Sequence, residues 1–213
     1  MSLIFNNLDK MSFDDLGDES EFIPLMTSED EEALEKENLP EVLPILPLTN
    51  TVLFPGVVIP INAGRDKSIK LINDANKSNK LIGVVSQKDI KVENPSIEDI
   101  YSVGTVAKIL RVLKMPDGNT TVIIQGKKRF KIKSVVKTDP YIQATINSLP
   151  DKNQRKSNNK FTATIDAIRD IALKIIKENP NIPSEASFAI KNIHSSAFLI
   201  NFVCSNMNIS VKD

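Results

Sequence analysis

Histidine and cysteine, which commonly take part in catalysis and metal binding, are scarce in this chain. It contains one histidine, His194, and one cysteine, Cys204. A single cysteine excludes an intramolecular disulfide and a cysteine-based zinc site, and a single histidine argues against a histidine metal cluster or a Ser-His-Asp triad. The sequence also lacks a GxxxxGK[ST] phosphate loop and an HExxH zinc motif. We therefore expect no catalytic residue, no metal site and no cofactor in this chain.

The strongest remaining signal for binding chemistry is a basic run, KKRFKIK, at residues 127–133. Lysines interleaved with an aromatic side chain are typical of proteins that bind single-stranded nucleic acid. Side chains alternate along a strand, however, so Phe130 would point away from Arg129 and Lys131. We expect Phe130 to face the core and the basic residues to form a solvated strand face. Nucleic-acid binding and contact with the acidic arm of the chain are the two alternatives.

Charge is distributed unevenly along the 213 residues, although the net charge is zero. Residues 1–41 contain thirteen acidic and two basic residues, a net charge of −11, so residues 42–213 carry +11. We interpret residues 1–41 as an acidic N-terminal arm, partly helical or disordered, that is solvated, lies on its own body or contacts a neighbouring subunit. The arm does not resemble a signal peptide, and no apolar run is long enough to cross a bilayer. We expect a bacterial, cytoplasmic protein with no membrane contact.

Residues 42–150 are predicted to form a β-rich subdomain with one helix. Apolar positions at helical spacing predict that helix over 66–77. Pro-Asp-Gly-Asn at 116–119 predicts a hairpin turn. Apolar and polar residues alternate imperfectly along the strand before this turn. Both faces of that strand must therefore be partly covered, as in a small closed or barrel-like sheet. The predicted strands are 80–87, 103–115, 120–125, 129–133 and 141–148.

Prolines dominate the stretch at residues 46–60, which reads LPLTNTVLFPGVVIP. Because proline has no amide hydrogen, we expect neither a helix nor a central strand to run through this stretch. The sequence predicts instead a short strand at 51–53, a turn at Pro55-Gly56 and a second strand at 57–61. The stretch contains no side chain suited to catalysis, which favours a binding or assembly module.

The end of the chain is predicted to be helical. Residues 151–159 (DKNQRKSNN) contain no apolar side chain and are a predicted linker. Residues 160–213 form a predicted helical subdomain, truncated at its C-terminal end, whose first helix ends at Asn179-Pro180 and places Arg169 on its polar face. Ser184 and Ser195 or Ser196 are the predicted caps of two further helices. The predicted apolar face of the first helix consists of Phe161, Ile165, Ile168, Ala172 and Ile175.

Three segments taken together resemble the N-terminal domain of Lon, the ATP-dependent protease. They are LPLTNTVLFPGVVIP at 46–60, GRDKSI at 64–69 and VGTVAKILRVLKMPDGNTTVIIQG at 103–126. The chain departs from the family pattern at Thr49, where an arginine is common, and at Asn62-Ala63, where the family has a more apolar pair. The resemblance implies an α+β fold, with a β-rich pseudo-barrel subdomain that includes one helix, followed by an α-helical bundle.

The resemblance also implies what the chain does. It implies a non-catalytic role in recruiting unfolded or degron-bearing protein substrates and in supporting a homo-oligomer, a hexamer, of an ATP-dependent serine endopeptidase. The ATPase and Ser-Lys peptidase domains, with their ATP and Mg, would lie outside this chain. Two alternatives are a free-standing Lon-type adaptor or regulatory domain and, less favoured, an RNA-binding pseudo-barrel suggested by analogy of fold alone.

A domain that recruits unfolded proteins needs a shallow apolar surface bordered by charged side chains. The competing interpretation is that the apolar candidates belong to the core and that Asp66 and Lys70 form an ordinary i,i+4 pair on a helix surface. The candidate contact residues are Leu53 and Phe54 at the predicted turn and Arg65, Asp66, Lys67 and Lys70 at the start of the first helix.

Overall fold

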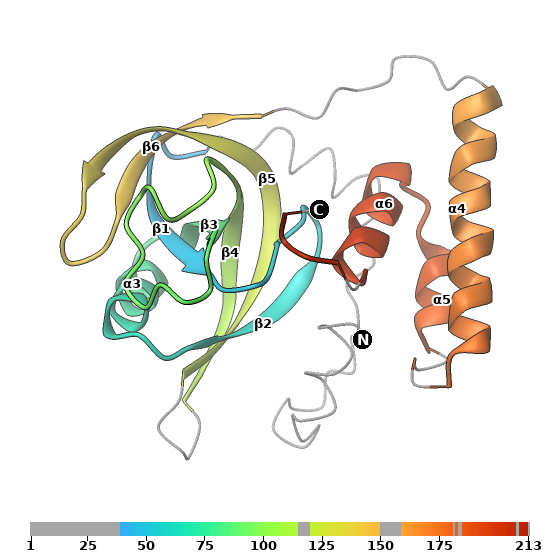
Figure 1. Cartoon of the computed structure of the whole chain (residues 1–213), viewed down its shortest axis with the longest axis horizontal. Helices are drawn as coiled ribbons and strands as arrows, with labels where there is room; N and C mark the ends of the chain where they lie inside the picture. Colours follow the sequence, from blue (N-terminus) through green and yellow to red (C-terminus); the bar gives the residue numbers. More distant parts are fainter. Residues whose placement is uncertain are drawn as a thin grey trace. The chain divides into compact units, whose positions relative to one another are not determined.

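The computed structural model describes residues 39–114, 120–149, 159–180, 182, 185–207 and 209–212. Within these ranges, residues 39–149 form one compact unit and residues 159–207 form another (Figure 1). The first unit consists of strands and one helix, and the second consists of helices. The fold is α+β, as predicted.

The first unit is a sheet that closes on itself. The strand order is β2-β5-β4-β3-β1-β6, and β5 pairs with β6 in addition. Five strands therefore form a ring, and β2 is added to it at β5. The sequence predicted a barrel-like sheet because both faces of the strand at 103–115 had to be covered. The closed ring confirms this prediction. The strands are β1 (Val42–Leu48), β2 (Val58–Ala63), β3 (Leu81–Ser86), β4 (Val103–Lys114), β5 (Thr120–Lys137) and β6 (Gln143–Ser148).

The long strand β5 closes the barrel. Its first half pairs with β2, its second half pairs with β6, and β4 lies along much of its length. The sequence predicted two separate strands here, and this was wrong, because the pairing with β4 continues through two register shifts that bend the ladder. The predicted turn at 116–119 lies outside the described residues. The strands on either side of it do pair as a hairpin, with Lys114 opposite Thr120.

The ring of Phe130 lies in the hydrophobic core of the barrel and is fully buried, as predicted. Two glycines make room for this ring. A Cβ added at Gly83 would lie 2.9 Å from the ring, and one added at Gly104 would lie 3.1 Å from it. Glycine at these two positions therefore lets β3 and β4 pass close to an aromatic side chain.

No central strand runs through residues 46–60, as expected, because β1 ends at Leu48 and the edge strand β2 begins at Val58. The prolines of β1 do not, however, keep β1 itself from the centre of the sheet. β1 contains Pro44 and Pro47, yet it pairs with β3 on one side and β6 on the other. The amide of Ile45 donates to the carbonyl of Ile142, 2.8 Å away on the β6 side. Amide groups alternate along a strand, so Pro47 faces the same side, beyond the last β6 pair at Pro44–Gln143. Its missing N–H therefore removes no hydrogen bond from the sheet.

The region after β1 also differs from prediction. Residues 51–53 are not a strand; they belong to a loop that leads to the turn at Pro55-Gly56. The predicted strand at 57–61 is present as β2, and the predicted helix is present as α3 (Asp66–Lys77). α3 buries Leu71, Ile72 and Ala75.

The second unit contains α4 (Asn159–Glu178), α5 (Glu185–Asn192) and α6 (Ser196–Ser205). The side chain of Ser195 accepts a 3.0 Å hydrogen bond from the amide of Phe198 and caps α6, as one of the two predicted options had it. The predicted cap at Ser184, the segment 151–158 and residues 1–38 of the acidic arm lie outside the described residues. None of the helices in the described ranges is long and apolar enough to cross a membrane.

The predicted faces of α4 were partly wrong. Ile175, predicted to face the core, is 54% exposed. Arg169, predicted to face solvent, is half-buried and donates to the carbonyls of Ile190 and Ile193 at the end of α5. The last carbonyls of a helix have no partner within the helix, so an arginine that reaches them satisfies groups that would otherwise remain unpaired.

Candidate functional site

Two loops emerge side by side from one end of the barrel. β1 and β3 are parallel neighbours, and Leu48 at the end of β1 pairs with Ser86 at the end of β3. The loop after β1 and the loop after β3 therefore begin at the same end of the sheet. α3 also begins there, because Arg65 reaches Gln87. We call this region the loop end and define it as residues 49–57, 64–67 and 87–92.

A cluster of three polar side chains joins these segments. Arg65 Nη2 donates to Gln87 Oε1 at 2.8 Å and to Thr49 Oγ1 at 3.3 Å. The hydroxyl of Thr49 in turn donates to Gln87 Oε1 at 3.2 Å. Each residue comes from a different segment, so the cluster fixes the two loops and the start of α3 relative to one another.

Gln87 is the buried centre of this cluster, with only 2% of its surface exposed. Its Nε2 donates to the carbonyls of Asp89 at 3.0 Å and Val92 at 2.6 Å. Both ends of the buried amide are thus hydrogen-bonded, which offsets the cost of removing it from water. One side chain therefore shapes the first turn of the loop after β3.

The loop after β1 is fixed to the barrel by side-chain hydroxyls. Ser86 Oγ donates to the carbonyl of Thr51 at 2.6 Å, and Thr105 Oγ1 donates to the carbonyl of Leu53 at 2.6 Å. The amide of Gly56 donates to the carbonyl of Gly126 at 2.9 Å. These bonds hold the loop in one arrangement before any partner binds, which reduces the entropy lost on binding.

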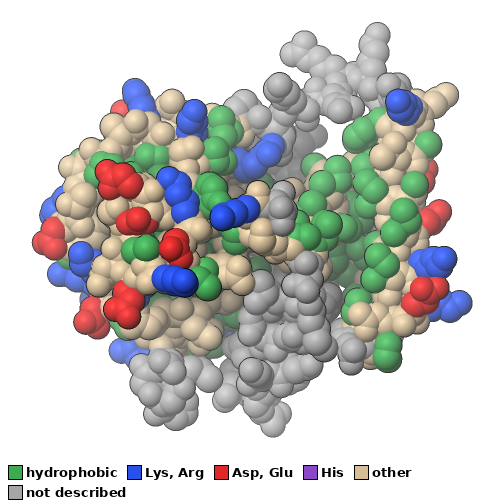
Figure 2. Space-filling view, in the orientation of Figure 1, with side chains coloured by type: hydrophobic (Ala, Val, Ile, Leu, Met, Phe, Trp, Pro, Cys, Tyr) green, Lys and Arg blue, Asp and Glu red, His purple; other side chains and the backbone are tan. Residues whose placement is uncertain are grey.

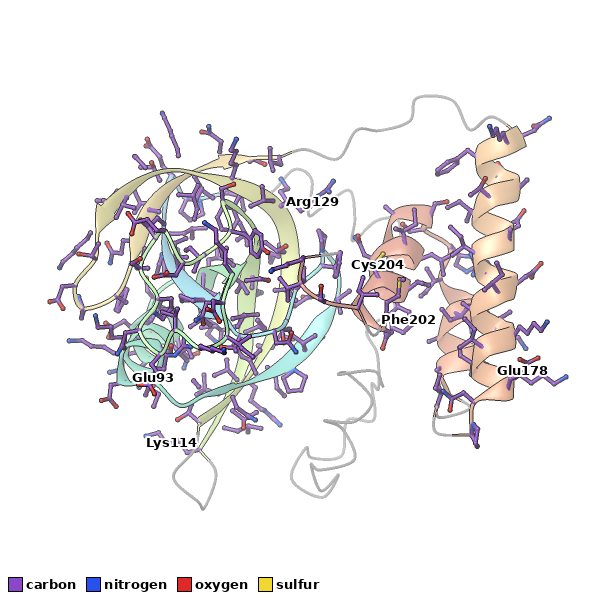
Figure 3. All side chains as sticks on the ribbon, viewed as in Figure 1. Glu93, Lys114, Arg129, Glu178, Phe202 and Cys204 are labelled. Carbon is purple, nitrogen blue, oxygen red and sulfur yellow. The ribbon has the colours of Figure 1, made fainter. Side chains whose placement is uncertain are left out.

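The loop after β3 is also held at its base. The amide and hydroxyl of Ser96 donate to Asp99 Oδ2 at 2.8 Å and 2.7 Å. These two hydrogen bonds lower the pKa of the Asp99 carboxyl, since they favour its charged form. The amide of Lys88 donates to the carbonyl of Asp99 at 2.7 Å and closes the loop. Figure 3 labels Glu93 in the same loop.

The six candidate residues have different environments. Leu53 is only 4% exposed, so its assignment to an exposed contact surface was wrong, because the loop turns this side chain into the core. Phe54 is half-buried at the turn. Arg65 is half-buried in the polar cluster, whereas Asp66, Lys67 and Lys70 are exposed on α3. Whether these residues bind a partner stays a prediction.

The structure also identifies residues that sequence reasoning missed. Val52 is 40% exposed and Ile90 is 63% exposed, one on each of the two loops. Ile90 stands among charged neighbours in the run KDIK, and an apolar residue isolated in a polar loop was the available signal. Val52 had no such signal, because it precedes a similar side chain, Leu53, that is buried. Sequence alone did not identify Gln87, whose role depends on contacts distant in the chain.

Charged side chains of both signs are exposed at the loop end. Lys88, Asp89 and Lys91 flank Ile90 and are exposed. Asp66 and Lys67 are exposed at the start of α3. Exposed apolar and charged side chains on neighbouring loops suit the binding of a polypeptide segment.

Comparison with protein families gives a direct assignment. The family model for the ATP-dependent protease La (LON) substrate-binding domain matches residues 42–213. The chain is 61% identical over 206 residues to a Lon protease of Flavobacterium johnsoniae, covering 97% of this chain and 25% of that protein. It is 50% identical over 193 residues to a Lon protease of Cytophaga hutchinsonii, covering 91% of this chain and 24% of that protein. The chain thus spans about a quarter of the length of these relatives.

Solved structures show the same fold. The N-terminal domain of a Mycobacterium avium complex Lon protease superposes with a TM-score of 0.60 at 20% identity, covering 76% of this chain and 80% of that one. A Lon N-terminal domain protein from Xanthomonas campestris superposes with a TM-score of 0.50 at 14% identity, covering 77% of this chain and 97% of that one. The match of the family model over residues 42–213 shows that the chain belongs to the LON substrate-binding domain family.

Proposed function

We propose that this chain is the non-catalytic substrate-recognition and assembly domain of an ATP-dependent, Lon-type serine protease of the bacterial cytoplasm. The match to the substrate-binding domain family over residues 42–213 is the observation that carries this proposal. Under this proposal, the chain recruits unfolded or degron-bearing proteins to the protease and supports its homo-hexamer. ATP and Mg are bound, and peptide bonds are cleaved, by other domains of the protease.

The loop end is the surface that best fits this role. Unfolded proteins differ from folded ones in exposing apolar side chains along an extended backbone. The loop end offers two exposed apolar side chains, Val52 and Ile90, on loops that hydrogen bonds hold in place. Asp66 and Lys67 lie at the same end of the barrel and supply charge for steering a polypeptide toward it.

The direct test compares an unfolded and a folded form of one protein. Fluorescein-labelled α-lactalbumin, either reduced and carboxymethylated or native, is titrated with the 213-residue chain and followed by fluorescence anisotropy. We expect saturable binding of the unfolded form and no binding of the native form at the same concentrations. Equal binding of both forms, or binding of neither, contradicts the proposed function. The same preparation should neither hydrolyse ATP nor cleave casein.

The proposed place in a larger protease has its own test. The native reading frame that encodes this chain is sequenced beyond residue 213. A GxxxxGK[ST] phosphate loop encoded downstream is the expected result. A stop codon directly after the chain would favour the adaptor or regulatory alternative.

A further inference from the structure

The helix α4 leaves part of its surface both apolar and exposed. Ile171 is 59% exposed, and Ile175, one turn further along, is 54% exposed. Ala167 is exposed on the preceding turn. Figure 2 shows apolar side chains along the length of this helix. Large apolar side chains that are exposed on successive turns of one helix indicate a contact surface.

This surface lies on the side of α4 that faces away from α5. Arg169 donates to the carbonyls of Ile190 and Ile193 and so marks the side that meets α5. Successive residues of a helix are about 100° apart, so Ile171 lies roughly 160° around the helix from Arg169. The exposed apolar positions fall within an arc of roughly 80°. We call them the outer stripe of α4 and define it as Ala167, Ile171 and Ile175.

Charged side chains border the outer stripe along one side. Asp166 and Asp170 lie in the first half of this border, and both are exposed. Lys174 and Lys177 lie in its second half and are also exposed. The four positions fall within an arc of roughly 80° next to the stripe. The border is therefore negative toward the start of α4 and positive toward its end.

An antiparallel second copy of α4 matches both the stripe and the border. When two identical helices pair about a two-fold axis, the same side of each helix meets. With the axis at Ile171, this side chain meets its own copy, and Ala167 lies opposite Ile175, a small side chain against a large one. The same arrangement brings the acidic half of each border beside the basic half of the other.

The order of the charges selects this orientation. In the antiparallel pair, Asp166 lies within one turn of Lys177 of the second copy. Asp170 lies within one turn of Lys174 of the second copy. A parallel pair would place the border of one helix against the uncharged side of the other stripe and form neither contact. Within one copy, Asp170 and Lys174 are also an i,i+4 pair, but such a pair on an exposed helix is weak.

We propose that α4 is a self-association surface, on which a second copy of this chain packs antiparallel about Ile171. The two outer stripes exclude water from the contact, and the charged borders set its direction and register. The contact is one helix wide, so it is weak between separate chains and becomes effective when copies are linked in a larger assembly. The inference deepens the proposed function, on which it rests, by naming a contact for the assembly role.

Sedimentation velocity of the 213-residue chain, from about 10 μM to about 1 mM, measures the pairing. We expect a monomer–dimer equilibrium in the wild type. Ile171→Ser should weaken it by at least about tenfold, because the substitution enters a two-fold contact twice. Leu110→Ser is the control, since it replaces a 43% exposed apolar side chain of the barrel, and it should leave the equilibrium unchanged. A wild type that stays monomeric throughout, or equal dimerisation of the two variants, would overturn the proposal.

Charge reversal tests the antiparallel register. Asp166→Lys/Asp170→Lys makes the border wholly positive, and Lys174→Glu/Lys177→Glu makes it wholly negative. Each variant alone should dimerise at least about tenfold more weakly than the wild type at low salt, because like charges then lie opposite each other. An equimolar mixture should form a 1:1 dimer about as tight as that of the wild type and weaker in about 0.5 M NaCl.

A control separates the contact on α4 from general attraction between oppositely charged chains. Ile171→Ser, added to both charge-reversed variants, should abolish the dimer in their mixture. A mixture that associates no more tightly than its components, or a mixed dimer that survives Ile171→Ser, contradicts the proposal.

Recognition of unfolded protein is measured separately on the same chain. Ile171→Ser should bind reduced, carboxymethylated α-lactalbumin as the wild type does, because Ile171 lies outside the loop end. A chain that binds this probe and never dimerises overturns the pairing and leaves the recognition role standing. A chain that dimerises through α4 without binding the probe supports the pairing and contradicts the recognition role.

Discussion

Arg65 and Gln87 are joined by a 2.8 Å hydrogen bond between the guanidinium Nη2 and the side-chain carbonyl oxygen. This bond links the start of α3 to the loop after β3. Thr49 completes the cluster by accepting from Arg65 and donating to Gln87. The hydroxyl of Thr49 therefore contributes to the contact between these segments.

Replacing Gln87 with methionine tests whether this cluster shapes the loop end. Methionine has a similar volume but cannot hydrogen-bond to the carbonyls of Asp89 and Val92 or accept from Arg65. We expect the free energy of unfolding in urea to fall by about 1–3 kcal/mol, the cost of leaving buried polar groups unpaired. The amide of Val92, which donates to the carbonyl of Asp89, should exchange with solvent faster. Unchanged exchange there would contradict the role assigned to Gln87.

Replacing Val52 and Ile90 together with serine tests the apolar contact surface. Both side chains are exposed, so the variant should fold with the wild-type thermal midpoint. We expect about tenfold weaker binding of reduced, carboxymethylated α-lactalbumin, because each side chain contributes part of its burial energy to the complex. Leu110→Ser is the matched control. Leu110 is 43% exposed, and Lys108 pairs with Leu81 at the start of β3, so Leu110 lies at the opposite end of that strand.

The outcome separates two hypotheses. If the wild-type chain binds the unfolded probe and the double variant binds equally well, the recognition role stands and the loop end is not its site. If the wild-type chain does not bind the probe, the recognition role itself fails. If Leu110→Ser weakens binding as much as the double variant, the contact is not specific to the loop end.

Reversing the charge of Lys67 and Lys70 tests the candidate residues on α3. Both are exposed, and glutamate is compatible with a helix surface, so Lys67→Glu/Lys70→Glu should unfold at the wild-type temperature. We expect at least about threefold weaker binding of the carboxymethylated probe, which is itself acidic, and a smaller difference at high salt. Binding indistinguishable from that of the wild type would make these lysines ordinary solvated helix surface.

The elements with local signals were predicted well from the sequence. Helical periodicity, with Asp66 as the signal for the helix start, gave the bounds of α3, and the alternation around Phe130 gave its burial. The sequence-based predictions failed where contacts between residues distant in the chain determine the local structure. Pro47 is compatible with a central strand only because the β6 pairing has ended before it is reached. Arg169 faces inward only because α5 ends beside it, which no pattern within α4 reveals.

At the candidate site, too, features with a local sequence signal were predicted and features set by distant contacts were not. The charged start of α3 was found because a helix surface follows from periodicity. Leu53 and Val52 are adjacent and similar in type, and the sequence could not tell which of them is buried. The structure shows that Leu53 is the buried one, and its carbonyl accepts a hydrogen bond from Thr105, a contact across 52 residues.

Gly126 should not tolerate a side chain, whereas Gly64 should. A Cβ at Gly126 would overlap the carbonyl oxygen of Phe54, and backbone cannot move aside as a flexible side chain can. We expect Gly126→Ala to lower the free energy of unfolding by about 2–3 kcal/mol. A Cβ at Gly64 meets nothing within 4 Å, so Gly64→Ala should be neutral or stabilise by about 0.5 kcal/mol through the unfolded chain. Urea unfolding of both variants measures the contrast, and equal effects would contradict the close approach at Gly126.

Replacing Arg169 with methionine tests the contact between α4 and α5. Methionine keeps much of the apolar stem but cannot donate to the carbonyls of Ile190 and Ile193. It also removes a positive charge from a helix C-terminus, where a cation is stabilising. We expect a loss of about 1.5–3 kcal/mol from the stability of the helical unit, the range for hydrogen bonds to charged groups, measured by urea unfolding followed at 222 nm. Lys174→Met is the control, because Lys174 is exposed on the same helix and the change alters charge and helix propensity in the same way. We expect it to change the free energy of unfolding by less than about 0.5 kcal/mol. Equal losses in the two variants would mean that the arginine acts only through its charge and that its hydrogen bonds to α5 contribute nothing.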